Sequence, residues 1–312
     1  MNTDRVGAGR DDDLLTECLV DNDVTKRSMR PRGNTDPIGK LLLDAGKLSA
    51  ADAERVVEFQ KVNNVRFGEA ALALGLIGQE DIQYALARQF DYPYLAPGHT
   101  AFSSDLVTAY SPSSPEAETF RILRTQVLMR WFNAGNKALL MCGAEGGEGV
   151  SYQVANLAVA CSQLGEKTLI IDANFRTPRQ HLIFNLSRNR QGLSDVLAGR
   201  ATKFVYKFAS LPGLSVIPSG TSPPNPAELL SRRNFGLLLH HLGNRYDMIV
   251  IDSPPVNVYA DAQSVAAVTK GAVLVVRLNA TRVAQLEKAK KLLLSTRAEI
   301  VGAVVSRGQA AN

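Results

Sequence analysis

The stretch Ala138–Ser151, which reads ALLMCGAEGGEGVS, decides the fold of the larger part of this chain. Its first five residues are apolar and predict a buried strand, and the glycines that follow predict a tight loop. The next residues predict a helix over 151–164. A strand, a glycine loop and a helix in this order present backbone N–H groups to a phosphate. The stretch therefore predicts a phosphate-binding loop.

The same alternation of apolar runs and helical patterns continues on both sides of the loop. We expect strands at Ala138–Cys142, Thr168–Asp172, Leu214–Pro218, Met248–Asp252, Ala272–Arg277 and Val301–Val305. We expect helices at 115–132, 151–164, 226–243, 261–269 and 282–297. Strands that are buried on both faces and separated by helices form parallel sheets. The predicted fold class is therefore α/β, with a doubly wound, mostly parallel sheet that carries the loop.

A smaller unit is predicted from an internal repeat near the N-terminus. Three residues, Gly39, Gly46 and Gln60, are each followed 29 positions later by a residue of the same type. The second set is Gly68, Gly75 and Gln89. Each copy is typical of a short helix, a glycine C-cap and a longer helix. Residues 37–95 are therefore predicted to be a duplicated all-α domain. The expected remainder is a disordered leader (1–36), a linker (96–113), the α/β domain (114–307) and a tail (308–312).

Composition argues against several classes of protein. Apolar runs fall far short of the ~20 residues of a membrane-spanning helix, so we expect a cytoplasmic protein. Three cysteines without a C-x-x-C pair argue against a disulfide framework and a Cys-rich metal site. Residues 114–312 carry 23 Lys and Arg against 13 Asp and Glu. This excess favours a polyanionic ligand, such as a nucleotide, a nucleic acid, an acidic partner or an anionic membrane, although a solvated basic surface would look the same.

Two of the expected strands end in an acid, Asp172 and Asp252. Ligands of parallel sheets bind at the carboxyl ends of the strands. A magnesium nucleotide requires a hydroxyl from the loop, a carboxylate beyond it and a carboxylate that orients the nucleophile. Ser151, Asp252 and Asp172 fit these roles and are the candidate metal ligands. Either acid taken alone could instead be a strand-end cap.

Five motifs follow one another in the larger domain: Glu118-x-x-Arg121-x-x-Arg124, Asn156-Leu157-Ala158, Gly192–Leu197, Pro223–Leu230 and Asp252-Ser253-Pro254-Pro255. With the loop, they resemble the bacterial tyrosine kinases of exopolysaccharide systems, of the chain-length-determinant (EpsG) type, which are related to the cell-division ATPase MinD. The resemblance implies ATP or ADP and Mg²⁺ as ligands. It also implies a homo-oligomer and a membrane-embedded polysaccharide copolymerase as partner at the inner face of the membrane, with no nucleic acid partner.

The resemblance also assigns roles to individual residues. The candidate catalytic residues are Asp172, Asn174 and Asp252. The candidate nucleotide-binding residues are Gly146, Gly147, Glu148, Gly149, Val150, Ser151, Tyr152, Arg176, Ser306 and Arg307. The candidate contacts between subunits are Glu118, Arg121 and Arg124.

The sequence departs from the pattern of these kinases at four points. Val150 stands where the loop lysine is expected, Asn174 replaces the second acid of a D-x-D motif, and Ser306 replaces an asparagine beside the adenine. No tyrosine follows Tyr259, so the C-terminal tyrosine cluster is missing. We therefore predict a nucleotide-binding regulator of chain length and export with weak or no kinase activity. The alternatives are an active protein-tyrosine kinase and a MinD-like ATPase switch.

The repeat units 37–60 and 66–89 resemble the N-terminal domain of type II secretion and pilus ATPases, which in some members binds cyclic di-GMP. The candidate contacts to that ligand are Gly39, Gln60, Arg66, Phe67, Gly68 and Gln89. Pro37 stands where the first copy would carry its arginine, so the first half-site is predicted to be weaker. An adaptor that docks a protein partner is the alternative.

Overall fold

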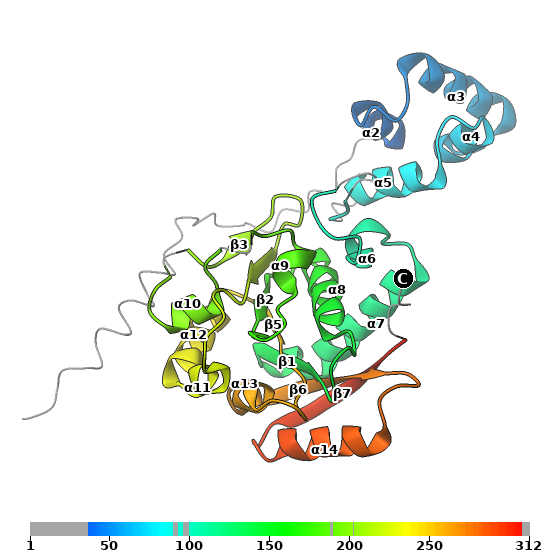
Figure 1. The fold of residues 1–312 in the computed structure, drawn as a ribbon. Helices are drawn as coiled ribbons and strands as arrows, with labels where there is room; N and C mark the ends of the chain where they lie inside the picture. Colours follow the sequence, from blue (N-terminus) through cyan, green and yellow to red (C-terminus); the bar gives the residue numbers. More distant parts are fainter. Residues whose placement is uncertain (1–36, 90–92, 96–99, 188–189, 202, 308–312) are drawn as a thin grey trace, which may run out of the picture. The chain divides into compact units, whose positions relative to one another are not determined.

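The computed structural model describes residues 37–89, 93–95, 100–187, 190–201 and 203–307. They belong to two compact units, a helical one that contains residues 37–95 and an α/β one that contains residues 100–307 (Figure 1). The expected leader and tail lie outside the described residues. Within these ranges, no helix has the length and apolar character needed to cross a membrane.

The helical unit shows the predicted short and long helix in each copy of the repeat. Its helices are α2 (Ile38–Asp44), α3 (Ala50–Asn63), α4 (Phe67–Ala73) and α5 (Gln79–Gln89). Gly46 and Gly75 follow the two short helices with the same φ of +66°, a backbone conformation that favours glycine. The core is made of small and aliphatic residues from both copies: Leu41, Leu42, Leu48, Val56, Ala70, Ala71, Ile77 and Ala85.

The α/β unit is built on a seven-stranded sheet in the order β3-β4-β2-β5-β1-β6-β7. The strands are β1 (Ala138–Gly143), β2 (Thr168–Asp172), β3 (Tyr206–Lys207), β4 (Leu214–Ile217), β5 (Met248–Asp252), β6 (Gly271–Arg277) and β7 (Glu299–Ser306). All neighbouring strands are parallel except β3 and β4. The predicted fold class, α/β with a mostly parallel sheet, is confirmed.

Helices cover both faces of this sheet, which explains why its central strands are mostly apolar up to the acids that end two of them. The helices are α6 (Val107–Tyr110), α7 (Pro115–Arg130), η1 (Phe132–Ala134), α8 (Val150–Gln163), α9 (Gln180–Ile183), α10 (Leu193–Leu197), α11 (Pro226–Ser231), α12 (Arg233–Gly243), α13 (Asp261–Thr269) and α14 (Val283–Leu294). Side chains of α10 to α14 share one apolar cluster with β1, β2 and β5. On the other face, α8 contacts the same three strands and α7 packs on α8 (Figure 1).

Two features differ from the sequence-based expectation. The helix expected over 226–243 is two helices, because Arg232 between them has an extended backbone with φ −68° and ψ 150°. Four short elements, α6, α9, α10 and β3, were not expected. They span two to five residues, which is too short to show a helical or strand period.

Part of the segment expected to be a linker, 96–113, packs on the α/β unit. Helix α6 lies within it and contacts α8. The backbone N–H of Thr108 donates to Asn156 Oδ1 at 3.0 Å, and Asn156 Nδ2 donates to the carbonyl of Asp105 at 2.8 Å. A buried side chain of α8 therefore fixes this segment beside the first turns of the helix.

Candidate functional site

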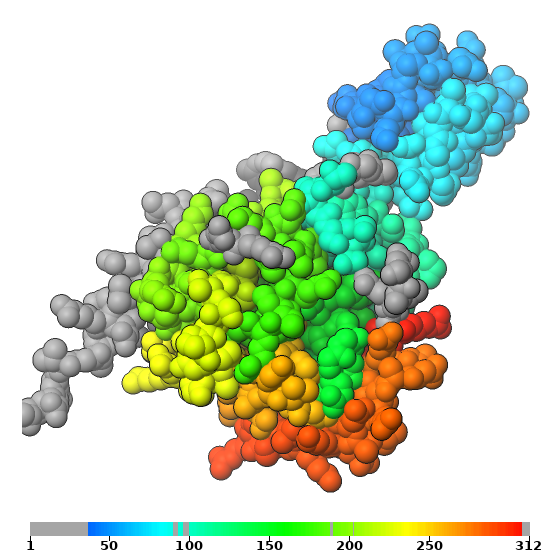
Figure 2. Space-filling view, in the orientation of Figure 1, coloured from blue at the N-terminus to red at the C-terminus, as the bar shows by residue number. Residues whose placement is uncertain are grey.

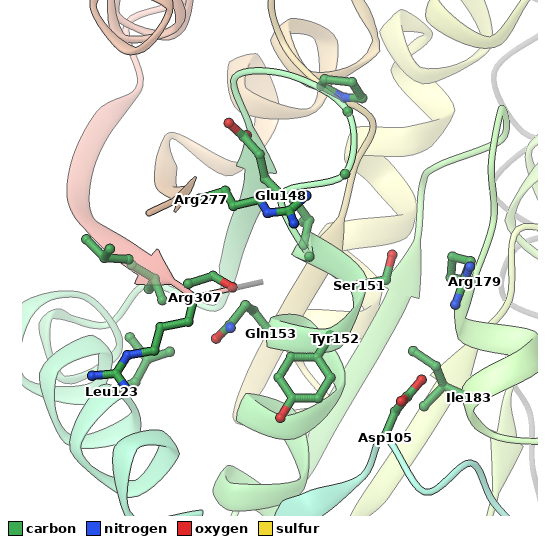
Figure 3. Close-up of a pocket in the computed structure, with 18 of the residues that line it drawn as sticks. Asp105, Leu123, Glu148, Ser151, Tyr152, Gln153, Arg179, Ile183, Arg277 and Arg307 are labelled. Carbon is green, nitrogen blue, oxygen red and sulfur yellow. The ribbon is translucent and has the colours of Figure 1, made fainter. Parts of the chain in front are cut away.

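A large cleft opens at the carboxyl ends of the central strands of the α/β unit (Figure 3). Its volume is about 1490 Å³, more than the ~300–1,000 Å³ that small-molecule pockets usually have. The glycine loop 145–151, the first two turns of α7 and the segment 304–307 line it. The predicted loop therefore lies in the place where parallel sheets bind ligands.

The backbone of the loop has the conformation that its glycines predict. Gly147 and Gly149 have φ angles of +80° and +82°, which side-chain-bearing residues rarely adopt. Gly149 is also the N-cap of α8. The N–H groups at the start of a helix have no partner within it, and the helix dipole places partial positive charge there. The loop and α8 together form a site suited to an anion.

Glu148, a predicted nucleotide contact, also braces the loop. Its side chain is only 3% exposed. One carboxylate oxygen accepts from the backbone N–H of Glu145 at 3.2 Å, and the other accepts from the hydroxyl of Thr281. A Cβ at Gly143 would collide with this carboxylate, so the first glycine of the loop makes room for Glu148. Glu148 therefore connects the loop to the segment between β6 and α14.

The two predicted acids lie side by side. Asp172 and Asp252 end adjacent strands, pair in register and are fully buried. Asp172 accepts three backbone hydrogen bonds, from the N–H groups of Asn174 at 3.1 Å, Arg179 at 3.3 Å and Gln180 at 3.1 Å. Asp252 Oδ2 accepts from Gln180 Nε2 at 2.8 Å. Its Oδ1 has no partner among the described residues.

Burial makes it costly to ionise this pair. Loss of solvent is the main reason that the pKa of Asp172 lies well above its usual value, and the charge of Asp252 adds to the effect. Burial also raises the pKa of Asp252, to about 6, although hydrogen bonds from Ser151 and Gln180 oppose the shift. Two adjacent buried carboxylates of this kind are most stable as anions when a cation lies between or beside them.

The oxygen atoms around Asp252 fit a magnesium ion whose remaining ligands are water and phosphate oxygens. Asp252 Oδ1 and Gln180 Oε1 are buried oxygens without partners among the described residues, and Ser151 contributes a hydroxyl within hydrogen-bonding reach of Asp252. No group of three or more His, Cys, Asp or Glu side chains that could hold a metal occurs in the described part of the chain. Mg²⁺ usually takes one or two carboxylates and completes its shell with water and phosphate oxygens.

The structure places most of the other predicted nucleotide contacts in the cleft. Val150, Tyr152, Ser306 and Arg307 all line it. Val150 presents an aliphatic side chain at the loop. The hydroxyl of Tyr152 donates to Glu116 Oε1 at 2.7 Å, which fixes the ring against the first turn of α7.

Two other predicted site residues are committed to neighbouring groups. Asn174 lines the cleft, but its Oδ1 accepts from the backbone N–H of Thr177 at 3.0 Å. Arg176 is not among the residues that line the cleft. Its Nε is 3.0 Å from Asp261 Oδ2, and its guanidinium stacks 3.9 Å from the centre of the Tyr259 ring. Arg176 therefore supports α13 in this structure, and its predicted contact to nucleotide stays a prediction.

Sequence reasoning missed one residue beside the acid pair, Gln180, and two arginines that line the cleft. Gln180 is fully buried and donates to both the Ser151 carbonyl, at 3.0 Å, and Asp252. It lies in the short helix α9, so no period indicated its direction. Arg179 and Arg277 line the cleft. The position of Arg277 at the end of an expected strand was the only available signal for either.

The predicted subunit contacts on α7 have partners within their own unit. Arg121 forms an ion pair with Glu118 at 3.1 Å and donates through Nη1 to the carbonyl of Pro112 at 2.7 Å. Arg124 Nη1 donates to the carbonyl of Ala160 at 2.8 Å. These two arginines therefore tie α7 to the preceding segment and to α8. A contact between subunits at this edge stays a prediction.

The predicted cyclic di-GMP contacts lie in the helical unit, where packing explains both glycines. A Cβ at Gly39 would meet the ring of Phe67 at 3.0 Å, and one at Gly68 would meet Ile82 Cδ1 at 3.2 Å. Both glycines are candidate contacts to the ligand, but the direction in which a side chain would point from each faces the interior of the unit. Arg66 is exposed, and Gln60 and Gln89 are half-buried.

Comparison with known proteins places the α/β unit among proteins of bacterial polysaccharide synthesis. Residues 136–299 match the family model "Cellulose biosynthesis protein BcsQ". The CapB protein of Staphylococcus aureus is 38% identical over 207 residues, which cover 65% of this chain and 90% of CapB. Tyrosine-protein kinase YwqD of Bacillus subtilis is 35% identical over 203 residues, covering 65% of this chain and 85% of YwqD.

Solved structures of such proteins also match this chain. The chimerical protein CapA2B2 is 35% identical, with a TM-score of 0.62, and the match covers 72% of this chain and 98% of that one. The kinase domain of Escherichia coli tyrosine kinase ETK is 30% identical, also with a TM-score of 0.62, and the match covers 69% and 85% of the two chains. The proposed likeness of residues 37–95 to secretion ATPases stays a prediction.

Proposed function

The chain belongs to the bacterial tyrosine kinases of capsule and exopolysaccharide synthesis, and we propose that it binds ATP or ADP with Mg²⁺ in the cleft and regulates polysaccharide chain length and export. The observation that carries this proposal is the buried, unpartnered Oδ1 of Asp252 beside the loop. An unpaired buried carboxylate oxygen is costly. A magnesium ion on the phosphates of a nucleotide would supply the missing partner.

We propose that phosphotransfer is slow. The loop keeps its N–H groups, its helix N-terminus and Ser151, so it keeps the means to bind phosphate. Val150 removes the lysine charge that the related loops are expected to place on the transferred phosphate. Loss of one such group commonly lowers the rate by ~10²-fold or more. An active kinase that acts on tyrosines of other proteins remains the second candidate.

Calorimetry of the full chain with Mg·ADP and Mg·ATP tests nucleotide binding, together with an assay of phosphate transfer to tyrosine. Val150→Lys is expected to raise affinity about tenfold and to raise phosphotransfer. Val150→Met is the matched control, because it lengthens the side chain without adding charge. If Val150→Lys changes neither affinity nor phosphotransfer, the loop is not the phosphate site. Rapid phosphotransfer by the natural chain would instead support the active kinase.

A membrane-embedded polysaccharide copolymerase is the proposed partner, and it would hold the chain at the inner face of the membrane. Family membership supports this partner, as does the match to a protein described as the chimerical CapA2B2. The family model matches residues 136–299 and so does not include residues 37–95. We propose that they bind cyclic di-GMP or dock a protein of the export machinery.

A further inference from the structure

The cleft contains arginines but no lysine from the loop. Three basic residues line it, Arg179, Arg277 and Arg307. The phosphates of ADP or ATP carry several negative charges, and the amides of one helix N-terminus offset only part of them. Because Val150 is aliphatic, a side-chain cation that acts on the phosphates together with Mg²⁺ has to come from another position.

Of these three arginines, Arg277 is the one on a strand next to β1, which leads into the loop. It is the last residue of β6, the strand next to β1. The register pairs Val275 with Gly143, so Arg277 stands two residues beyond the level at which the loop begins. In the view of Figure 3, Arg277 overlaps Glu148 of the loop, whereas Arg307 extends toward Leu123. Arg179 lies in the same figure on the far side of Ser151.

The loop itself fixes the backbone of Arg277. The N–H of Arg277 donates to Thr281 Oγ1 at 2.9 Å, and the Thr281 hydroxyl in turn donates to Glu148. The N–H of Thr281 also donates to the Arg277 carbonyl at 3.0 Å. Residues 277–281 are thereby tied to the loop. A side chain whose base is already positioned loses less freedom when it binds a ligand.

The guanidinium of Arg277 is available for a ligand. It is half-buried, and it makes no hydrogen bond or ion pair with any other described residue. The Glu148 carboxylate of the loop accepts from Glu145 and Thr281. The planar set of N–H donors of Arg277 suits two phosphate oxygens at once.

We propose that Arg277 binds the β-phosphate, and the γ-phosphate of ATP, in place of the lysine missing at position 150. This inference rests on the proposed nucleotide site and deepens it. It makes Arg277 a ligand-binding residue that compensates for Val150 from a neighbouring strand.

Titration of the full chain with Mg·ATP, Mg·ADP and AMP tests the assignment in four variants. Arg277→Gln is expected to weaken ADP and ATP binding by about 10- to 100-fold, the range for one charge-assisted contact, and to change AMP binding little. Arg277→Lys should keep most of the affinity. Adding Val150→Lys to Arg277→Gln should restore nucleotide affinity. The increase in affinity should be larger in that double variant than when Val150→Lys is made in the natural chain, because both charges act on the same phosphates.

Arg282→Gln is the matched control, since Arg282 lies a few residues further along, is exposed and does not line the cleft. Thermal melting of every variant shows that folding is intact. If the natural chain binds ADP and Arg277→Gln binds it equally well, the role of Arg277 is wrong while the nucleotide site stands. If the natural chain and Val150→Lys bind neither ADP nor ATP, the proposed function fails, and the role of Arg277 fails with it.

Discussion

Asp252→Asn is expected to stabilise the protein in the absence of metal. The pKa of Asp252 is raised from 3.8 to about 6, so the folded state holds this proton to a higher pH than the unfolded state. The contribution of this proton to the free energy of unfolding is complete below about pH 4. It is lost as the pH rises through about 6. At 1.36 kcal/mol per pKa unit, the ionised carboxylate costs the fold about 3 kcal/mol above pH 6. Asparagine cannot ionise, so it avoids this cost.

We expect about 1–2 kcal/mol of net gain for Asp252→Asn, because the amide accepts the Ser151 and Gln180 hydrogen bonds less well than a carboxylate does. In a unit of this size the gain corresponds to a rise in Tm of about 3–6 °C. The assay is thermal or denaturant unfolding in EDTA between pH 5 and pH 8. The stability of the natural chain should fall over this range, whereas that of the variant should change less.

Asp172→Asn is the matched control and should stabilise the protein less, because burial also raises the pKa of Asp172 but lost hydrogen bonds offset the gain. Its carboxylate accepts three backbone N–H groups, and an amide would turn its own N–H toward some of them, at a cost of about 1–3 kcal/mol. Saturating Mg·ADP should then stabilise the natural chain more than Asp252→Asn. If Asp252→Asn unfolds at the same temperature as the natural chain or lower at pH 8 in EDTA, the buried pair is not strained as we describe.

Two further predictions concern assembly and the helical unit. The triple variant Glu118→Ala, Arg121→Ala and Arg124→Ala is expected to sediment as smaller particles than the natural chain. Glu118→Ala alone is the control, because it keeps the hydrogen bond from Arg124 to Ala160. If all three proteins have equal masses, this edge of α7 is not part of a subunit interface. Calorimetry of the full chain with cyclic di-GMP at physiological salt should show weak binding that Arg66→Ala abolishes and Pro37→Arg strengthens, because only the second copy has an arginine at this position. No heat with either the natural chain or Pro37→Arg would favour a docking module.

The main strands and the loop were predictable because each depends on local chemistry. β2 and β5 were expected with the bounds that they have, since a strand buried on both faces is a continuous apolar run that ends at an acid. The positive φ angles of Gly147 and Gly149 follow from a loop that only glycine can form. These features depend little on residues distant in the sequence.

Other parts of the site depend on partners far along the chain. Gln180 donates to Asp252, 72 residues away, and Glu148 accepts from Thr281, 133 residues away. The resemblance assigned Arg176 to nucleotide binding, yet its partner is Asp261, 85 residues away. A motif indicates which side chains are present, but the packing of the sheet decides which of their neighbours they meet.

The acid pair Asp172 and Asp252 helps to decide whether the cleft, with Val150 in place of a loop lysine, still binds a ligand. Two buried carboxylates side by side destabilise the metal-free fold, and a pair of amides or apolar residues in their place would often be neutral or favourable. One of the two carries an oxygen that no other described residue satisfies. A structural role accounts for Asp172, which accepts three backbone hydrogen bonds, but it does not account for Asp252 Oδ1. Under the proposed function a cation would be the partner of that oxygen, so the pair favours a cleft that keeps a metal-bound anion although Val150 stands in place of the lysine.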